Sequence, residues 1–227
     1  MCFSATASFA LSAVLGGVGA VSLLQNRNKE HQMVAAIPLL FSIQPAAEGI
    51  VWMTMSNPAQ ATLHRLATNA FLIVALMIWP LWMPLALRRA EGDSERRPLL
   101  TGLAGVGLFV AMFAGQELLR FPPTARIVGH SLTYGYGPGG LQYFAYLAVY
   151  IVPAALPFFV SSLRHARIAG LVLISSLILS DIVQRDAITS VWCFFAAVFS
   201  GLIVWMGFQE SRAPRPALAR IVDFPRA

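Results

Sequence analysis

Long apolar segments fill most of this 227-residue chain, and short polar segments separate them. An α-helix rises 1.5 Å per residue, so about 20 apolar residues cross a hydrocarbon core roughly 30 Å thick. The segments of this kind are residues 3–24, 33–55, 66–87, 99–119, 141–163, 168–184 and 187–208. They are continuously apolar and lack the alternation of polar and apolar residues that barrel strands show. The pattern therefore predicts an all-α protein, with a single domain of seven transmembrane helices over residues 1–208.

The composition agrees with lipid as the solvent of most of the surface. Hydrophobic residues make up 57% of the chain and charged residues 11%, and the mean hydropathy is +0.68. These polar residues are too few to cover the surface of a soluble domain of this length. The expected partner of the chain is therefore a lipid bilayer.

The basic residues fall mainly into every second gap between the apolar segments, which predicts the orientation in the membrane. One side carries twelve of them: Arg27, Lys29, Arg88, Arg89, Arg96, Arg97, Arg164, Arg167, Arg212, Arg215, Arg220 and Arg226. The opposite side carries four: Arg65, Arg120, Arg126 and Arg185. Because basic loops stay in the cytoplasm, we expect an external N-terminus and a cytoplasmic basic tail over residues 209–227.

The charge composition also bears on partners and source. The isoelectric point near 10.0 is typical of nucleic-acid-binding proteins, but the basic residues are dispersed over short loops with no folded basic domain behind them. No nucleic-acid partner is therefore expected. Lysine is almost completely replaced by arginine, which suggests a GC-rich coding sequence and a bacterial inner membrane.

Polar side chains at membrane depth are the first candidates for function, because an ionisable group there is costly unless it meets a partner or water. Glu48 lies roughly 10 Å inside the second segment. No basic residue lies three or four positions before or after it, so its own helix supplies no ion-pair partner. Gln44 and Trp52 lie one turn away on the same helical face. Cys193 and Asn69 are expected at a similar depth in their own segments, so these residues predict a polar layer near the outer surface. A protonated, hydrogen-bonded structural glutamate is the alternative for Glu48.

The other reactive side chains leave several interpretations open. Cys2 and Cys193 are compatible with a disulfide, a soft metal ligand or simple packing. His130 lies in the longest connection, residues 120–140, which is long enough to fold over the mouth of a cavity. Asp181 with Arg185 has the spacing of a local ion pair within one helix.

Small residues recur every fourth position along the first segment, which predicts close packing against a neighbouring helix. They are Ser4, Ser8, Ser12, Gly16 and Ala20.

Five short motifs in the chain resemble those of a group of bacterial seven-helix membrane proteins that share a domain of unknown function. The motifs are Met1-Cys2-Phe3-Ser4-Ala5, Glu48-Gly49-x-x-Trp52, Trp79-Pro80, His130-Ser131-x-x-Tyr134 and Trp192-Cys193-Phe194-Phe195-Ala196. The resemblance spans about residues 1–208 and implies the architecture, but it carries no activity. Its motifs contain Cys2, Glu48, His130 and Cys193, which favours one shared site.

Three functions follow from these residues. The first is a binding protein that holds copper or zinc near the outer face through Cys2, Glu48, His130 and Cys193, whose donor atoms suit these metals. The second is a membrane-embedded zinc-dependent lipid or amide hydrolase, although paired histidines are missing from the last segment. The third is a small-solute transporter that uses Glu48, although no inverted repeat is evident. In each case the expected cavity lining is Gln44, Trp52, Asn69, Ser131, Tyr134, Asp181, Arg185 and Trp192.

Overall fold

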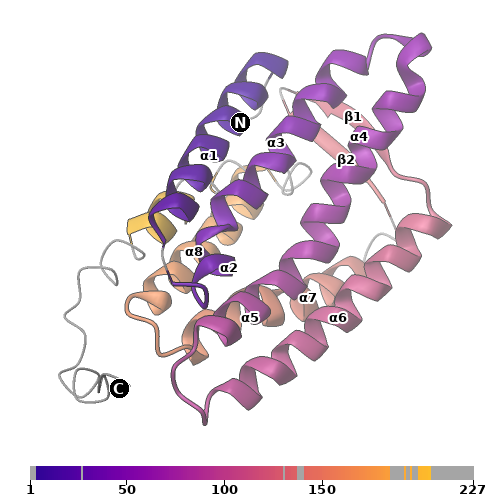
Figure 1. The fold of residues 1–227 in the computed structure, drawn as a ribbon. Helices are drawn as coiled ribbons and strands as arrows, with labels where there is room; N and C mark the ends of the chain where they lie inside the picture. Colours follow the sequence, from indigo (N-terminus) through magenta and orange to yellow (C-terminus); the bar gives the residue numbers. More distant parts are fainter. Residues whose placement is uncertain are drawn as a thin grey trace, which may run out of the picture.

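Helices dominate the computed structural model, which describes residues 4–26, 28–129, 131–136, 141–184, 192, 195 and 199–205. In chain order these are α1 (Ala5–Gln25), α2 (Gln32–Ala35), α3 (Ile37–Thr54), η1 (Pro58–Gln60), α4 (Ala61–Ile73), the π-helical segment η2 (Val74–Ile78), α5 (Trp79–Ala90), α6 (Arg97–Arg120), α7 (Leu141–Val160) and α8 (Ala166–Gln184). Figure 1 shows the longer helices running side by side as a bundle. The predicted helical segments up to residue 184 are confirmed.

Among the described residues, four helical stretches are long and apolar enough to cross a membrane: Ala5–Gln25, Gln32–Thr54, Pro58–Ala90 and Arg97–Arg120. Tyr146–Val160 is a shorter apolar helix. Of the last predicted span, 187–208, the structure describes only residues 192, 195 and 199–205, and all of these are helical. The basic tail lies outside the described residues.

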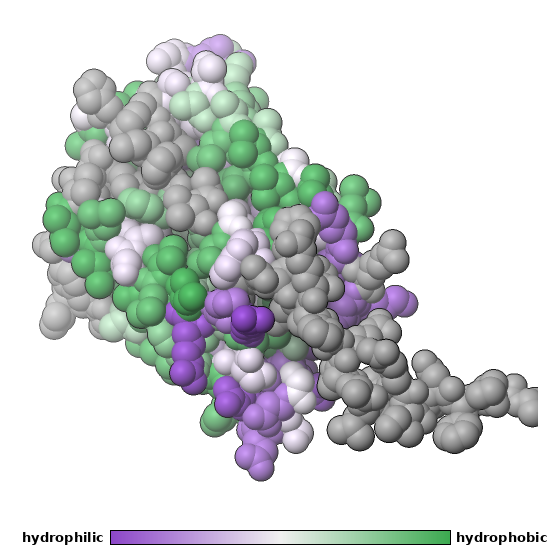
Figure 2. Space-filling model, turned by 90° about the vertical axis from the view of Figure 1, so that its left-hand side faces the viewer, coloured by the Kyte–Doolittle hydropathy of each residue, from purple (hydrophilic) through white to green (hydrophobic). Residues whose placement is uncertain are grey.

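The outer surface of the bundle is largely apolar. On α6, for example, Leu108, Phe109, Met112 and Phe113 are all exposed. Figure 2 shows hydrophobic residues over much of the described surface, with the hydrophilic residues mainly at the lower end and a smaller group at the upper end. Apolar helix surfaces of this extent are expected where lipid replaces water as the solvent.

A β-hairpin corrects the prediction of an all-α protein. The strands β1 (Thr124–Val128) and β2 (Ser131–Gly135) pair antiparallel, with Thr124 opposite Gly135 and Val128 opposite Ser131. Gly129 supplies the positive φ of 63° at the turn, a conformation that glycine adopts without strain. The sequence pattern predicts a loop over residues 120–140, because each strand has only five residues and neither is apolar enough to stand out.

The stretch α4–η2–α5 changes its hydrogen-bonding pattern near the middle of the bundle. The N–H of Trp79 donates to the carbonyl of Val74, which is the π-helical spacing. Pro80 has no N–H to continue the pattern, so carbonyls of the preceding turn lose their helical donor. The Tyr150 hydroxyl donates to the Ala75 carbonyl at 2.7 Å, and the Tyr146 hydroxyl makes a longer contact of 3.4 Å with the Leu76 carbonyl. Side chains of α7 thus replace the missing backbone donors.

Helices α1 and α3 pack closely through the small residues of α1, as predicted. Ser8 is fully buried, and the Ser12 hydroxyl donates to the Ser42 carbonyl at 2.8 Å. A Cβ added to Gly19 would lie 2.7 Å from the Leu39 Cα, so the two backbones nearly touch. The predicted packing role is confirmed for Ser8, Ser12 and Gly16, whereas Ser4 and Ala20 of the same row are exposed. Gly19, which makes the closest approach, was not part of the predicted row.

Candidate functional site

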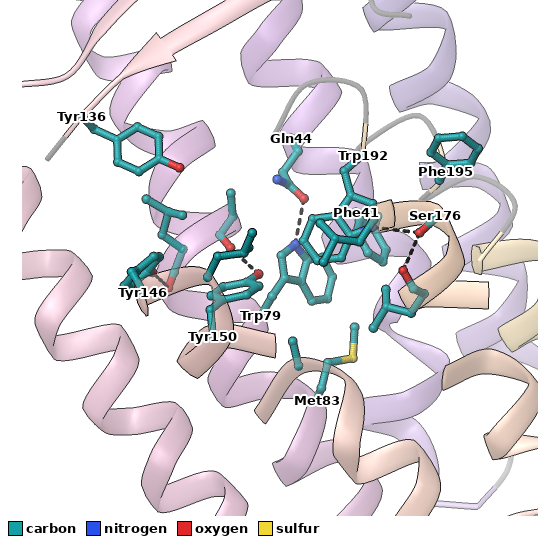
Figure 3. Close-up of a pocket in the computed structure, with 16 residues that line it drawn as sticks. Phe41, Gln44, Trp79, Met83, Tyr136, Tyr146, Tyr150, Ser176, Trp192 and Phe195 are labelled. Carbon is teal, nitrogen blue, oxygen red and sulfur yellow. Dashed lines mark hydrogen bonds between the residues drawn. The ribbon is translucent and has the colours of Figure 1, made fainter. Parts of the chain in front are cut away.

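A cavity lies between α3, α5, α7 and α8, and Figure 3 shows the side chains that surround it. The cavity volume that the centre of a water molecule can occupy is about 70 Å³. This volume has room for several waters or one small ring. Six aromatic side chains of the helical part of the chain line it: Phe41, Trp79, Tyr146, Tyr150, Trp192 and Phe195. No described residue that lines the cavity carries an ionisable Asp, Glu, Lys, Arg or His side chain.

The cavity lies near the middle of the helices that enclose it. Gln44 is close to the centre of the stretch Gln32–Thr54, and Ser176 is close to the centre of α8. Tyr150 occupies the corresponding position in α7. If the bundle spans a bilayer, this pocket is therefore at mid-depth, where a charged ligand is costly and an apolar one is favoured.

Gln44 and Trp79 form the polar floor of the cavity. The Trp79 Nε1–H donates to Gln44 Oε1 at 2.8 Å, between two side chains that are almost fully buried. Phe41, one turn before Gln44 on the same face of α3, stacks on Trp79 with ring centroids 4.0 Å apart. The stack and the hydrogen bond together fix the position of the Trp79 ring relative to α3.

The other polar groups around the cavity are bonded within the protein. The Tyr146 and Tyr150 hydroxyls contact the carbonyls released by the π-helical segment. On the opposite wall the Trp192 Nε1–H donates to Ser176 Oγ at 2.9 Å, and Ser176 Oγ donates to the Leu173 carbonyl at 2.7 Å. The dashed lines in Figure 3 trace these bonds.

The hairpin also contributes to the cavity. Tyr136, which follows β2, lines it from the side opposite Trp192. The strand itself is held by the bundle, because Leu132 is fully buried and the Tyr134 ring stacks on Phe71 of α4 at 4.4 Å. The long connection therefore packs against the bundle and reaches the pocket through Tyr136.

The structure distributes the residues predicted to line a cavity over more than one place. Gln44 and Trp192 line the pocket. Asn69 donates through Nδ2 to the Arg65 carbonyl of its own helix at 2.8 Å. Trp52 packs against a buried cluster that contains Ala47, Val51, Phe71, Leu132 and Tyr134. Ser131 is fully buried in β2, Asp181 is near the end of α8, and Arg185 lies outside the described residues.

Of the predicted metal ligands, only Glu48 is described. Its side chain is fully buried, as expected for a glutamate that faces the bundle interior. Cys2, His130 and Cys193 lie outside the described residues. Within the part of the chain that the structure describes, no three His, Cys, Asp or Glu residues are grouped to hold a metal ion. The copper or zinc site therefore stays a prediction.

Glu91 is a buried carboxylate that the sequence analysis missed. It follows the last residue of α5 and joins two connections, because it accepts hydrogen bonds from the Asp93 N–H at 2.9 Å and the Ser162 N–H at 2.7 Å. The hydroxyls of Ser161, at 3.0 Å, and Ser162 also donate to it. Burial raises the pKa of Glu91, but these hydrogen bonds outweigh burial and hold the pKa below its ordinary value. The only signal in the sequence was its position, because Glu91 is the first of three acidic residues in a short connection flanked by arginines.

Comparison with known proteins identifies a family but no activity. The Family of unknown function (DUF6629) matches residues 1–219, which confirms the resemblance found from the motifs. No curated protein and no solved structure matches the chain.

Proposed function

We propose that this chain, which belongs to the Family of unknown function (DUF6629), is a membrane protein that binds a small, neutral, largely apolar molecule in the pocket between α3, α5, α7 and α8. The observation that carries the proposal is the aromatic lining of a cavity at the middle of the helices, without an ionisable Asp, Glu, Lys, Arg or His among its described residues. Aromatic side chains supply a large contact area for an apolar ligand, and a few polar groups fix its orientation.

Binding is favoured over catalysis by the chemistry of the lining. Ser176, the aliphatic hydroxyl at the cavity, accepts from Trp192 and donates to a backbone carbonyl, and no histidine or carboxylate lines the described pocket to activate it. A nucleophile without an adjacent base is a weak catalyst. The pocket as described therefore fits a ligand that is held and released unchanged.

The proposed setting is a bacterial inner membrane crossed seven times, with the N-terminus outside and the tail in the cytoplasm. Support comes from the four long apolar helices, the twelve-to-four division of basic residues between the two sides and the apolar surface between hydrophilic ends in Figure 2. High periplasmic activity of alkaline phosphatase fused to the C-terminus would contradict this orientation.

Filling the cavity tests the proposed function. Ala154 is buried and lines the pocket, so Ala154→Leu places three more carbon atoms in the ligand's space. We expect the purified protein to bind indane, a small apolar ring compound, and the variant to bind it at least tenfold more weakly. Titration calorimetry in detergent, corrected for partition of indane into protein-free micelles, measures both affinities.

Ala148→Leu is the matched control, because Ala148 is on the same helix but exposed. It adds the same side chain outside the pocket and should leave the affinity unchanged. Absence of indane binding to the wild-type protein, or equal loss of binding in both variants, would reject the pocket as a ligand site.

A metal centre near the outer end of α3 is the second candidate, and the position of the hairpin favours it. Leu132 and Tyr134 of β2 share a buried cluster with Ala47 and Val51, which flank Glu48 on α3. The strand that begins immediately after His130 thus contributes side chains to the buried cluster that also contains neighbours of Glu48 on α3. Carboxylate, imidazole and thiolate are a ligand set that suits zinc or copper.

Metal content decides this second candidate. We expect purified protein to retain about one copper or zinc ion per chain, and Cys193→Ser and Glu48→Gln to lose it, because each removes one ligand. Elemental analysis of protein purified in detergent measures the content. Gln44→Met leaves the four predicted ligands in place and should retain the metal; a metal-free wild-type protein after growth with both metals would rule the centre out.

A further inference from the structure

The side-chain amide of Gln44 lines the pocket. Its Oε1 is occupied by the Trp79 indole N–H, which also determines which end of the amide faces the cavity. The Nε2 end, with two N–H donors, has no hydrogen-bond partner among the described residues, and Figure 3 shows it directed away from Trp79. A donor that faces a largely apolar cavity without an acceptor is unfavourable, so the bound state should supply one.

Three neighbouring donors are directed at acceptors within the protein. The Tyr150 hydroxyl is used by the Ala75 carbonyl and the Trp192 indole by Ser176. The Tyr146 hydroxyl is directed at the Leu76 carbonyl. Of Gln44 and these three side chains, only Gln44 has N–H groups that no hydrogen bond within the described part of the chain uses.

We propose that the ligand is a flat, neutral ring compound that carries a carbonyl oxygen, which accepts a hydrogen bond from Gln44 Nε2 while the ring lies against the aromatic wall. This inference rests on the proposed function, because it names the class of molecule for the same pocket. A ring suits the lining better than a flexible chain, since it offers faces and edges to Trp79, Tyr150 and Trp192 at little cost in conformational entropy.

A cationic ligand fits the same aromatic lining less well. Aromatic rings do attract quaternary ammonium groups, but no described residue of the lining is an Asp or Glu that would balance the charge. The Gln44 N–H groups also present their positive ends to the cavity, which disfavours a cation and favours an oxygen acceptor. The geometry therefore separates the two ligand classes.

Two ligands of nearly the same shape provide the test. Indane and 1-indanone differ by one carbonyl oxygen, and phenyltrimethylammonium represents the cationic class. We expect 1-indanone to bind the wild-type protein about tenfold more tightly than indane, because only the ketone offers an acceptor to Gln44 Nε2. Phenyltrimethylammonium should bind more weakly than either. Titration calorimetry in detergent with protein-free micelle blanks gives the three affinities.

Gln44→Met assigns the preference to the amide. Methionine keeps the length of the side chain and offers a weak sulfur acceptor for Trp79, but it has no donor. We expect it to reduce the preference for 1-indanone over indane to within about twofold, while Gln60→Met, at an exposed position, leaves the preference intact.

The outcomes separate this inference from the function on which it rests. Equal binding of indane and 1-indanone to the wild-type protein, tighter binding of the cation, or an unchanged preference in Gln44→Met would overturn the carbonyl assignment and leave the pocket as a ligand site. Binding of none of the three compounds would overturn both. The wild-type comparison of the two rings decides the inference even if Gln44→Met does not fold.

Discussion

Gly107→Ala is expected to destabilise the protein by about 3 kcal/mol or more, because a methyl group at this position has no room. A Cβ added to Gly107 of α6 meets the carbonyl oxygen of Pro80, lies 2.8 Å from its carbonyl carbon and lies 3.2 Å from the Leu81 Cα. All of these are backbone atoms of α5, so no side chain can rotate to make space. The two helices must separate, which also displaces Trp79 at the pocket. Unfolding by sodium dodecyl sulfate in mixed micelles measures the loss.

Gly105→Ala is the matched control on the same helix. A Cβ there meets nothing within 4 Å, and alanine has a higher helix propensity than glycine. The control variant should be as stable as the wild type or slightly more stable. Equal stability of Gly107→Ala and Gly105→Ala would show that α5 and α6 do not approach each other as closely as described.

The helices were predictable from the sequence because their cause is local. A continuous apolar segment of sufficient length must form a helix in lipid, since every backbone group has to be bonded internally. The same local logic placed Glu48 in the interior, and the structure buries it completely. It also identified the small residues of α1 as a packing surface. Each of these inferences needed only the segment in which the residue lies.

The pocket was not predictable because its geometry depends on pairs that are distant in sequence. Gln44 meets Trp79 35 positions later, and Tyr150 meets the Ala75 carbonyl across 75 positions. Gln44 and Trp192 were both predicted to line a cavity, but that cavity was expected near the outer surface. Nothing in a single segment indicates which helices are neighbours.

The π-helical segment connects the backbone chemistry to the site. Pro80 removes a donor, the change to π-helical spacing shifts the carbonyls that are left over, and Tyr150 binds one of them. The carbonyls orient the tyrosine rings that form one wall of the cavity. Because Gly107 has no side chain, α6 can lie directly against the backbone of Pro80 and Leu81 in α5. Pro80 thereby also determines the shape of the cavity. Segments of π-helix inside longer helices are frequent at functional sites for this reason.

Glu91 illustrates a different limit of sequence reasoning. It is outside the apolar segments, so the cost of burying charge in lipid did not single it out. Its importance comes from four hydrogen-bond donors that converge on one carboxylate. Asp93 of the α5–α6 connection supplies one of them, and Ser161 and Ser162 of the α7–α8 connection supply the other three. Hydrogen bonds to a charged acceptor are stronger than neutral ones, so the ionised form of Glu91 holds the α5–α6 and α7–α8 connections together.

Glu91→Gln is expected to destabilise the protein by about 2 kcal/mol at pH 7, because an amide nitrogen replaces one of the two acceptor oxygens and faces donors.

The stabilisation by Glu91 should also depend on pH in the wild type. The folded pKa of Glu91 is below the ordinary value of 4.5, so the unfolded state binds the proton more tightly; the stabilisation is fully present above pH 4.5 and is lost as the pH falls through the folded pKa. Unfolding in mixed micelles between pH 7 and pH 3 should show a decline that is smaller in Glu91→Gln. Glu95→Gln, at an exposed position in the same connection, should follow the wild type at every pH, and an identical decline in Glu91→Gln and the wild type would remove Glu91 as its cause.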